Sequence, residues 1–399
     1  MENDIKFLRI QNFKSLKDVT LHPRRVNLII GEPNVGKSNL LEAMTLLGGI
    51  TYEQTEKFMG SFIRYEEPRQ LFYDNLVGNT IKVETDRDVA IIAFFLNSEL
   101  FRYLLFDKKN LKTIAEKSIA NNSVYSLVRN IANNLEYSLK RNTPEQIDQE
   151  LNSKFTYLDD LNFFKFVYME FKNHPDSQIK SRAAIKNLWL TSPPKSYTFH
   201  KRTSINNDSG RHYLAPPFGS NLIEVIQTHS HLRQEIASMF ERYGQKLQLR
   251  MDERKLEIIK DQDGIIYSYP YSSVADTLQR IIFYLAAIES NDDAVLLFEE
   301  PEAHSFPVYV SKLGRRIVES RNNQFFIDTH SPYLITEILE TMLTDDAQAG
   351  ELAMFAAYYE DHQTKVHQLS DEEIRSIRND GIDVFYNMKR FTTGAASNA

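Results

Sequence analysis

The sequence predicts an α/β protein with a mixed β-sheet and flanking helices, an antiparallel β subdomain and an inserted helical domain. Three observations predict this class. An apolar run at 26–30 precedes a glycine-bearing loop and the apolar stretch 40–47, which is the order of strand, loop and helix. A second apolar run, 294–298, is typical of a buried parallel strand. Between about 98 and 192, the hydrophobic spacing changes to that of helices.

The N-terminal region predicts strands around one helix. Short β-prone or alternating runs are expected to form strands at 5–10, 19–21, 25–30, 80–84 and 89–95. The helix after the glycine-bearing loop should end at Gly48 and Gly49, because glycine commonly terminates helices.

The middle of the chain predicts a helical insertion, residues 99–204. Apolar residues recur at every fourth position from Leu127 to Leu139, and the aromatic run 161–168 is expected to pack in a core rather than to stack on bases. Pro193 and Pro194 mark the exit from this segment. We expect the insertion to serve recognition or assembly.

Positive charge is concentrated in the same segment. From Arg102 to Arg202 there are 17 Lys and Arg against 10 Asp and Glu, whereas the whole chain of 399 residues has a net charge of -7. The overall charge argues against a generally basic nucleic-acid binder. The local excess could contact phosphates, or it could be a solvated surface, and the sequence leaves both open.

The remaining chain returns to mixed elements. A strand and turn are expected at 211–217, helices at 221–243 and 276–289, and strands at 246–250, 256–260, 265–267, 294–298 and 323–328. Asp261 to Gly264 supplies a hairpin turn. Residues 1–98 and 205–391 are therefore expected to form the two parts of one α/β domain, and 392–399 a disordered tail.

Composition excludes several classes of protein. The absence of cysteine excludes a disulfide scaffold and thiolate metal sites. No apolar stretch is long enough to cross a bilayer, and the acidic, polar N-terminus does not resemble a signal peptide. We expect a cytoplasmic protein without a membrane partner.

Residues 31–38 (Gly-Glu-Pro-Asn-Val-Gly-Lys-Ser) match the pattern G-x-x-x-x-G-K-[ST] between a strand and a helix. Glycines at these positions let backbone N–H groups surround a polyphosphate, Lys37 can reach the β- and γ-phosphates, and Ser38 can ligate Mg²⁺. This motif predicts a site for ATP with Mg²⁺.

The strand at 294–298 ends in two acids, Glu299 and Glu300. In open α/β sheets, ligands bind at the carboxyl ends of the strands. Beside a phosphate-binding loop, this pair predicts a metal-side acid at Glu299 and a carboxylate that orients the attacking water at Glu300. The alternative is a core strand that ends in solvated acids.

Four motifs occur in a fixed order around these segments. They are 10–16 (Ile-Gln-Asn-Phe-Lys-Ser-Leu), 272–280 (Ser-Ser-Val-Ala-Asp-Thr-Leu-Gln-Arg), 299–304 (Glu-Glu-Pro-Glu-Ala-His) and 328–332 (Asp-Thr-His-Ser-Pro). The set resembles the ABC-type P-loop ATPase heads of the SMC and RecF class. It is most similar to OLD-like AAA-family ATPases, many of which belong to bacterial antiphage defence systems. The resemblance covers about 1–98 and 205–385.

The resemblance implies a role for each matching residue. Nucleotide-binding positions are Gly31, Asn34, Val35, Gly36, Lys37, Ser38, Asn39 and Lys14. Ser38 and Glu299 would hold the metal, although many relatives carry Asp at the second position. Glu300 would be the catalytic carboxylate, with Lys37 and the γ-phosphate-sensing His330 completing the catalytic set.

The segment 271–280 departs from the family pattern. Relatives carry a glycine-bearing signature whose serine and backbone amides contact nucleotide held by a second subunit. Val274 to Thr277 stand where glycines are usual, which puts close backbone approach in doubt. Ser272 or Ser273 could still donate to a neighbour's nucleotide, and either could equally serve as a helix N-cap.

The implied function is Mg²⁺-dependent ATP binding and hydrolysis by a homo-oligomer, a dimer or larger, that associates through its ATPase heads. About 70 residues follow His330, too few for the nuclease that OLD proteins append. We therefore expect a sensor or regulatory ATPase of an antiphage system that controls a nuclease or other effector in trans, with DNA a candidate partner. Alternatives are a RecF-like DNA repair ATPase and a nucleotide-gated scaffold with little turnover. The energising subunit of a transporter fits poorly, because the standard signature is absent.

Overall fold

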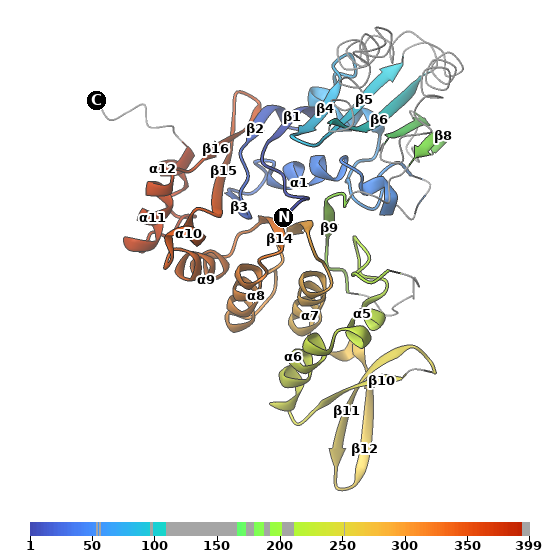
Figure 1. Ribbon diagram of the computed structural model, residues 1–399, viewed down its shortest axis with the longest axis vertical. Coiled ribbons are helices and arrows are strands. Elements are labelled where there is room, and N and C mark those ends of the chain that lie inside the picture. The colour runs from blue at the N-terminus through green and yellow to red at the C-terminus, as the bar shows by residue number, and fades with distance from the viewer. Residues whose placement is uncertain are drawn as a thin grey trace, which may run out of the picture.

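A computed structural model describes residues 1–52, 55, 57–95, 99–108, 166–172, 179–186, 192–201, 211–250 and 252–392 (Figure 1). Within these residues the strands form three sheets. One is mixed with six strands, one is antiparallel with seven strands, and one is a separate antiparallel sheet of three. The predicted α/β class, with a mixed sheet, flanking helices and an antiparallel β subdomain, is confirmed.

The six-stranded sheet carries the loop of residues 31–38. Its order is β16 (Gln363–Gln368), β15 (Leu352–Glu360), β3 (Val26–Gly31), β14 (Asn323–Asp328), β13 (Ala294–Glu299) and β9 (Lys195–Tyr197). All neighbours are parallel except β15 and β16. The three central strands are almost entirely buried, as their continuous apolar runs predict for strands covered on both faces.

Alternate residues of the central strands pack in two different cores. Leu28 and Ile30 of β3 lie in the core that contains α7 (Asp276–Glu289), α8 (Pro307–Glu319) and α9 (Pro332–Met342). Ile29 lies in the core that contains α1 (Lys37–Thr45). Because strand side chains alternate between faces, α1 and the group α7 to α9 cover opposite faces of the sheet (Figure 1). The other described helices are α5 (Leu222–Thr228), α6 (Ser230–Glu241), α10 (Asp346–Ala349), α11 (Asp371–Asn379) and α12 (Met388–Thr392).

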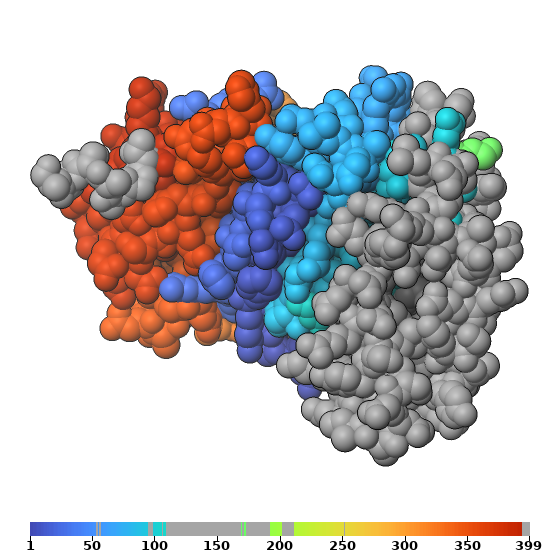
Figure 2. Space-filling view, turned by 90° about the horizontal axis from the view of Figure 1, so that it is seen from above, coloured from blue at the N-terminus to red at the C-terminus, as the bar shows by residue number. Residues whose placement is uncertain are grey.

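The seven-stranded sheet covers the other side of α1. Its order is β2 (Leu16–Leu21), β1 (Leu8–Phe13), β4 (Ile81–Thr85), β5 (Asp88–Phe95), β6 (Leu100–Asp107), β7 (Phe166–Lys172) and β8 (Ile179–Lys186). Residues from this sheet, from α1 and from the six-stranded sheet share one core. Seen from above, the N-terminal strands lie between the C-terminal part and β5 to β6 (Figure 2).

Three described segments of the predicted helical insertion are strands of the N-terminal sheet, and a fourth, 192–201, is a loop that contains β9. Residues 100–107, 166–172 and 179–186 form β6, β7 and β8, and they extend the N-terminal sheet instead of starting a separate domain. The end of the aromatic run 161–168 belongs to β7, whose Phe171 is buried against Phe101 of β6. Aromatic residues pack well on a pleated surface, so this pairing overrides the helical spacing. The stretch from Leu127 to Leu139 lies outside the described residues.

Two further expectations differ from the structure. Residues 211–217 form bends and turns rather than a strand. The helix expected at 221–243 is divided at His229 into α5 and α6. The imidazole Nδ1 of His229 lies 2.9 Å from the carbonyl oxygen of Val225, and the Thr228 hydroxyl donates to the carbonyl of Glu224. Such local side-chain bonds compete with the regular helix.

The small sheet and the short helices complete the description. The expected hairpin is confirmed as β11 (Lys255–Gln262) and β12 (Ile265–Pro270), joined to β10 (Lys246–Arg250). Short 3-10 helices occur at Gly49–Tyr52, Pro68–Leu71, Tyr73–Asn75 and Tyr271–Ser273. In the described part of the chain, no helix is long and apolar enough to cross a membrane. Residues 393–399 of the predicted tail lie outside this part.

Candidate functional site

The loop of residues 31–38 joins β3 to the N-terminus of α1. Asn34 and Gly36 have positive φ angles of 64° and 93°. A Cβ on Gly36 would lie 2.2 Å from Thr364 Oγ1 and 2.5 Å from Ser15 Oγ, so only glycine fits there. No side chain caps α1, although the Asn39 N–H donates to the Gly36 carbonyl at 3.1 Å, and the N-terminus of a helix favours an anion. This is the local geometry that the motif predicts.

Residues from both ends of the chain brace the loop. The Thr364 hydroxyl of β16 donates to the carbonyl of Val35 at 2.7 Å and lies 2.6 Å from the Ser15 hydroxyl. The Asn39 amide donates to Ser15 Oγ at 2.8 Å. Sequence reasoning missed Thr364, because no local pattern indicates that β16 lies against a loop more than 300 residues away.

Lys37 is buried against its own loop. Its Nζ donates to the carbonyls of Gly31 at 3.2 Å and Glu32 at 3.1 Å and lies 4.0 Å from Asp328 Oδ1. Burial lowers the pKa of Lys37, while the negative charges of Asp328 and Glu300 oppose that shift. The amine is therefore held at the loop, where it can supply positive charge to a phosphate.

Asp328, at the end of β14, lies beside the predicted metal ligand. The Ser38 hydroxyl donates to Asp328 Oδ2 at 3.1 Å. Burial raises the pKa of Asp328 to about 7, against the opposing charge of Lys37 and the bond from Ser38. Sequence reasoning passed over this acid. The available signal was an acid at the end of a predicted apolar strand, immediately before Thr329 and His330.

Glu299 and Lys14 belong to a network of charges beside the loop. Arg64 joins two acids: its NH2 is 2.7 Å from Glu299 Oε1 and its Nε is 2.8 Å from Glu42 Oε1. The Lys14 amine donates to Glu42 and to the Arg64 carbonyl. Burial lowers the pKa of Lys14. Lys14 thus lies beside the loop in contact with Glu42 and Arg64, and its contact with nucleotide stays a prediction.

Glu300 and His330 face each other at the ends of neighbouring strands. His330 Nε2 lies 3.6 Å from Glu300 Oε1, and burial lowers the pKa of His330. Glu302 Oε1 accepts from the Thr329 hydroxyl at 2.6 Å and from the His330 backbone N–H at 2.9 Å. Burial raises the pKa of Glu302. The buried Glu302 thus links the turn after β13 to the position of His330.

Ser272 and Ser273 lie apart from these residues. They end the short helix Tyr271–Ser273 after β12, and the Ser273 hydroxyl donates to the Pro270 carbonyl. Among the described residues, no hydrogen bond or ion pair joins either serine to the loop of 31–38. The β10–β12 sheet lies beyond α5 and α6, away from α1 (Figure 1). One chain therefore brings together the loop, both acids and His330, but not the two serines.

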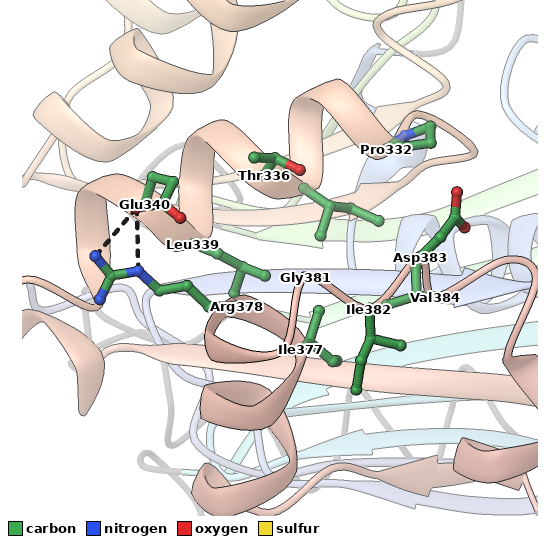
Figure 3. Close-up of a pocket in the computed structure, with 11 residues that line it drawn as sticks. Pro332, Thr336, Leu339, Glu340, Ile377, Arg378, Gly381, Ile382, Asp383 and Val384 are labelled. Carbon is green, nitrogen blue, oxygen red and sulfur yellow. Dashed lines mark hydrogen bonds and ion pairs between the residues drawn. The ribbon is translucent and has the colours of Figure 1, made fainter.

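Two cavities lie outside this site. One of about 300 Å³ is lined by α9, α11 and residues 381–384, with the Arg378–Glu340 ion pair at its edge (Figure 3). A more open groove of about 880 Å³ lies between α6 and α8. Neither is lined by residues 31–38. Within the described ranges, no cluster of three or more His, Asp or Glu side chains could hold a metal ion alone.

Residues 26–336 match the family model described as AAA domain, putative AbiEii toxin, Type IV TA system. Similar solved structures include an SMC head bound to the C-winged helix domain of ScpA, with 14% identity, a TM-score of 0.47, and coverage of 94% of this chain and 99% of that chain. The SMC head domain from Thermotoga maritima has 11% identity, a TM-score of 0.37, and coverage of 92% and 99%. An Smc head with an extended coiled coil from Pyrococcus furiosus, bound to the C-terminal domain of ScpA, has 13% identity, a TM-score of 0.45, and coverage of 94% and 98%. A search of curated proteins found no match.

Proposed function

The chain belongs to the family described as AAA domain, putative AbiEii toxin, Type IV TA system, and from this we propose that it binds ATP with Mg²⁺ and hydrolyses it. One observation carries the proposal. Lys37 and Ser38 lie beside Asp328. Glu299, Glu300 and His330 lie with them at the carboxyl ends of three adjacent parallel strands. That edge is where open α/β sheets bind ligands.

Each residue has a chemical task in this proposal. The N–H groups of the loop and the Lys37 amine bind the phosphates. Glu300 orients the attacking water, and His330, whose lowered pKa favours the uncharged imidazole, donates or accepts a hydrogen bond at the γ-phosphate.

The residues also fit a metal ion. Ser38 contacts the buried Asp328, and Glu299 pairs with Asp328 in register between β13 and β14. A hydroxyl and carboxylates are ligands that Mg²⁺ accepts together with substrate phosphates. When bound, Mg²⁺ would neutralise charge that develops on the phosphate oxygens.

Two substitutions test the enzymatic proposal. Lys37→Ala should weaken binding of a fluorescent ATP analogue at least tenfold, because a buried charge-assisted contact is lost. Glu300→Gln should retain ATP binding and lose most steady-state phosphate release, because it preserves shape and removes the carboxylate. Undiminished binding by Lys37→Ala, or full turnover by Glu300→Gln, would contradict these roles.

We further propose that the ATPase is the sensor or regulatory subunit of an antiphage system and acts on a nuclease or other effector in trans. The resemblance to OLD-like ATPases supports this role, as does a family description that includes a toxin of a toxin–antitoxin system. Phage challenge of cells carrying the gene with its genomic neighbours tests it. Protection that is lost in Lys37→Ala is expected, and equal plaque counts with and without the intact locus would contradict it.

A nucleotide-gated scaffold with little turnover is the second candidate. The segment 271–280 favours it, because Val274 to Thr277 stand where the related ATPases carry glycines. ATP binding that drives assembly without measurable phosphate release would identify the scaffold.

A further inference from the structure

The acid in contact with Ser38 is Asp328, not Glu299. β14 lies between β3 and β13, so its last residue is at the centre of the sheet, directly beside the loop. Asp328 pairs in register with Ile29 on one side and Glu299 on the other. The 3.1 Å bond from the Ser38 hydroxyl joins residues that are 290 positions apart in the chain.

One oxygen of Asp328 accepts no hydrogen bond. The residue is 1% exposed, and its Oδ1 is buried without a hydrogen bond. The nearest cation, Lys37 Nζ, lies 4.0 Å away and donates to two backbone carbonyls. A buried carboxylate oxygen without a partner is costly, because desolvation is not compensated. The arrangement indicates that another group completes the coordination of this carboxylate.

Glu299 is engaged elsewhere. Its Oε1 is 2.7 Å from the Arg64 guanidinium, which also binds Glu42. A glutamate that neutralises an arginine is a weaker candidate for a cation ligand than a buried carboxylate with an oxygen that accepts no hydrogen bond. Glu299 therefore serves to hold Arg64 and the segment that carries it.

A divalent cation could bind the Asp328 oxygen that accepts no hydrogen bond. Mg²⁺ in nucleotide sites is usually held by one or two carboxylates, with substrate phosphates and water as the other ligands. That pattern agrees with the absence, among the described residues, of a cluster that could hold a metal alone. We propose that Asp328, together with Ser38, holds the divalent cation of the bound nucleotide, and that Glu299 is a partner of Arg64. The inference rests on the proposed ATP binding.

The test is a Mg²⁺ titration of ATP binding. Binding of a fluorescent ATP analogue is measured with EDTA and at increasing Mg²⁺ for the parent, Asp328→Asn and Glu299→Gln. Mutation of a group that only supports a metal ligand costs about 10–100-fold in metal affinity, and loss of a ligand itself should cost no less. Asp328→Asn should therefore raise at least tenfold the Mg²⁺ concentration that gives half of the maximal increase in ATP binding. Binding of the analogue in EDTA should be unchanged. Glu299→Gln, the matched amide control, should shift that midpoint less than about threefold.

A spectrum of the bound metal ion distinguishes the loss of a metal ligand from misfolding of the variant. The electron paramagnetic resonance spectrum of Mn²⁺ bound with ATP should change in Asp328→Asn and remain parental in Glu299→Gln. Ser38→Ala should move the Mg²⁺ midpoint in the same direction as Asp328→Asn, and the double variant should show less than the sum of the two effects, because both contact one ion. Melting temperatures confirm that each variant is folded.

The outcomes distinguish the two proposals. Normal ATP binding with an unshifted Mg²⁺ midpoint in Asp328→Asn overturns the assignment of Asp328 alone. A larger shift of the Mg²⁺ midpoint in Glu299→Gln than in Asp328→Asn would show that Glu299, not Asp328, is the metal ligand. A parent protein that binds no ATP at any Mg²⁺ concentration overturns the proposed function, and this inference with it.

Discussion

Single buried polar residues decide how the site is held. Glu302 is 8% exposed and accepts two hydrogen bonds, from the Thr329 hydroxyl and the His330 backbone. Lys195 is 4% exposed, donates to Asn291 and lies over the Tyr213 ring. Each residue is a charge or potential charge in a dry environment, so a change of its side chain or its protonation alters stability directly.

Glu302→Ala should destabilise the fold and slow phosphate release. The substitution leaves a buried hydroxyl and a part-buried N–H without an acceptor, which costs about 2 kcal/mol or more in free energy of unfolding. Glu302→Gln keeps an acceptor oxygen and should recover most of both losses. Urea unfolding and steady-state turnover of the two variants measure the effects. Parental stability in Glu302→Ala would show that these bonds contribute little.

Lys195 should make the protein more stable as pH rises above 8. Burial lowers its pKa to about 8 from an ordinary 10.5, so the folded state releases this proton before the unfolded state does. The contribution of Lys195 to stability then increases between these two pH values, by on the order of 2 kcal/mol, and does not change below them. Lys195→Met should flatten this part of the profile. Urea unfolding at pH 7.5, 9 and 10 compares the slopes, and equal slopes in both proteins would contradict the prediction.

At the scale of elements, the strand–loop–helix unit depends on distant strands. The loop between β3 and α1 is packed against β16 through Thr364 and against the β1–β2 turn through Ser15. A phosphate-binding loop must present its N–H groups in one conformation, and these contacts restrict the alternatives. The C-terminal hairpin of β15 and β16 thus takes part in the nucleotide site without a motif of its own.

Gly36→Ala should impair nucleotide binding more than it impairs folding. The new Cβ would lie at 2.2 Å from Thr364 Oγ1 in a positive-φ conformation, so the loop must move. At least a tenfold loss of ATP affinity is expected. Gly350→Ala is the control, because that glycine has a right-handed helical conformation and its nearest neighbour is 3.5 Å away. Equal ATP affinities in the two variants would show that the tight packing at Gly36 is not required.

At the scale of the whole molecule, the proposed site is divided between two regions. The loop, the acids and His330 meet at one edge of the six-stranded sheet, whereas Ser272 and Ser273 follow β12 in the small sheet (Figure 1). A second copy could supply these serines to the nucleotide of the first. Closure of two copies around ATP is the kind of rigid-body transition that converts binding energy into a conformational change.

Glu300→Gln with ATP should therefore form a dimer or larger assembly. ATP stays bound in this variant because hydrolysis is blocked, so the assembly that closes around ATP accumulates. Light scattering with and without ATP measures the mass. The further change Ser272→Arg with Ser273→Arg should abolish the ATP-dependent increase, whereas Ser238→Arg, at an exposed serine of α6, should leave it intact. An oligomer without nucleotide would indicate assembly through another surface, and a monomer throughout would refute a shared site.

The sequence by itself determined the parts whose signals are local. The apolar run, the glycines and the following helix predicted the loop of 31–38, and a buried strand ending in acids predicted β13 with Glu299 and Glu300. Tertiary structure decided the contacts that depend on strand order, because these join residues that are far apart in the chain. It placed Asp328 against Ser38, Thr364 against the loop and Arg64 between Glu42 and Glu299. It also made strands of 100–107, 166–172 and 179–186, for which helices were predicted. Strand pairing joins residues far apart in the chain and is selected by burial across a whole sheet, so a local pattern of side chains does not encode it.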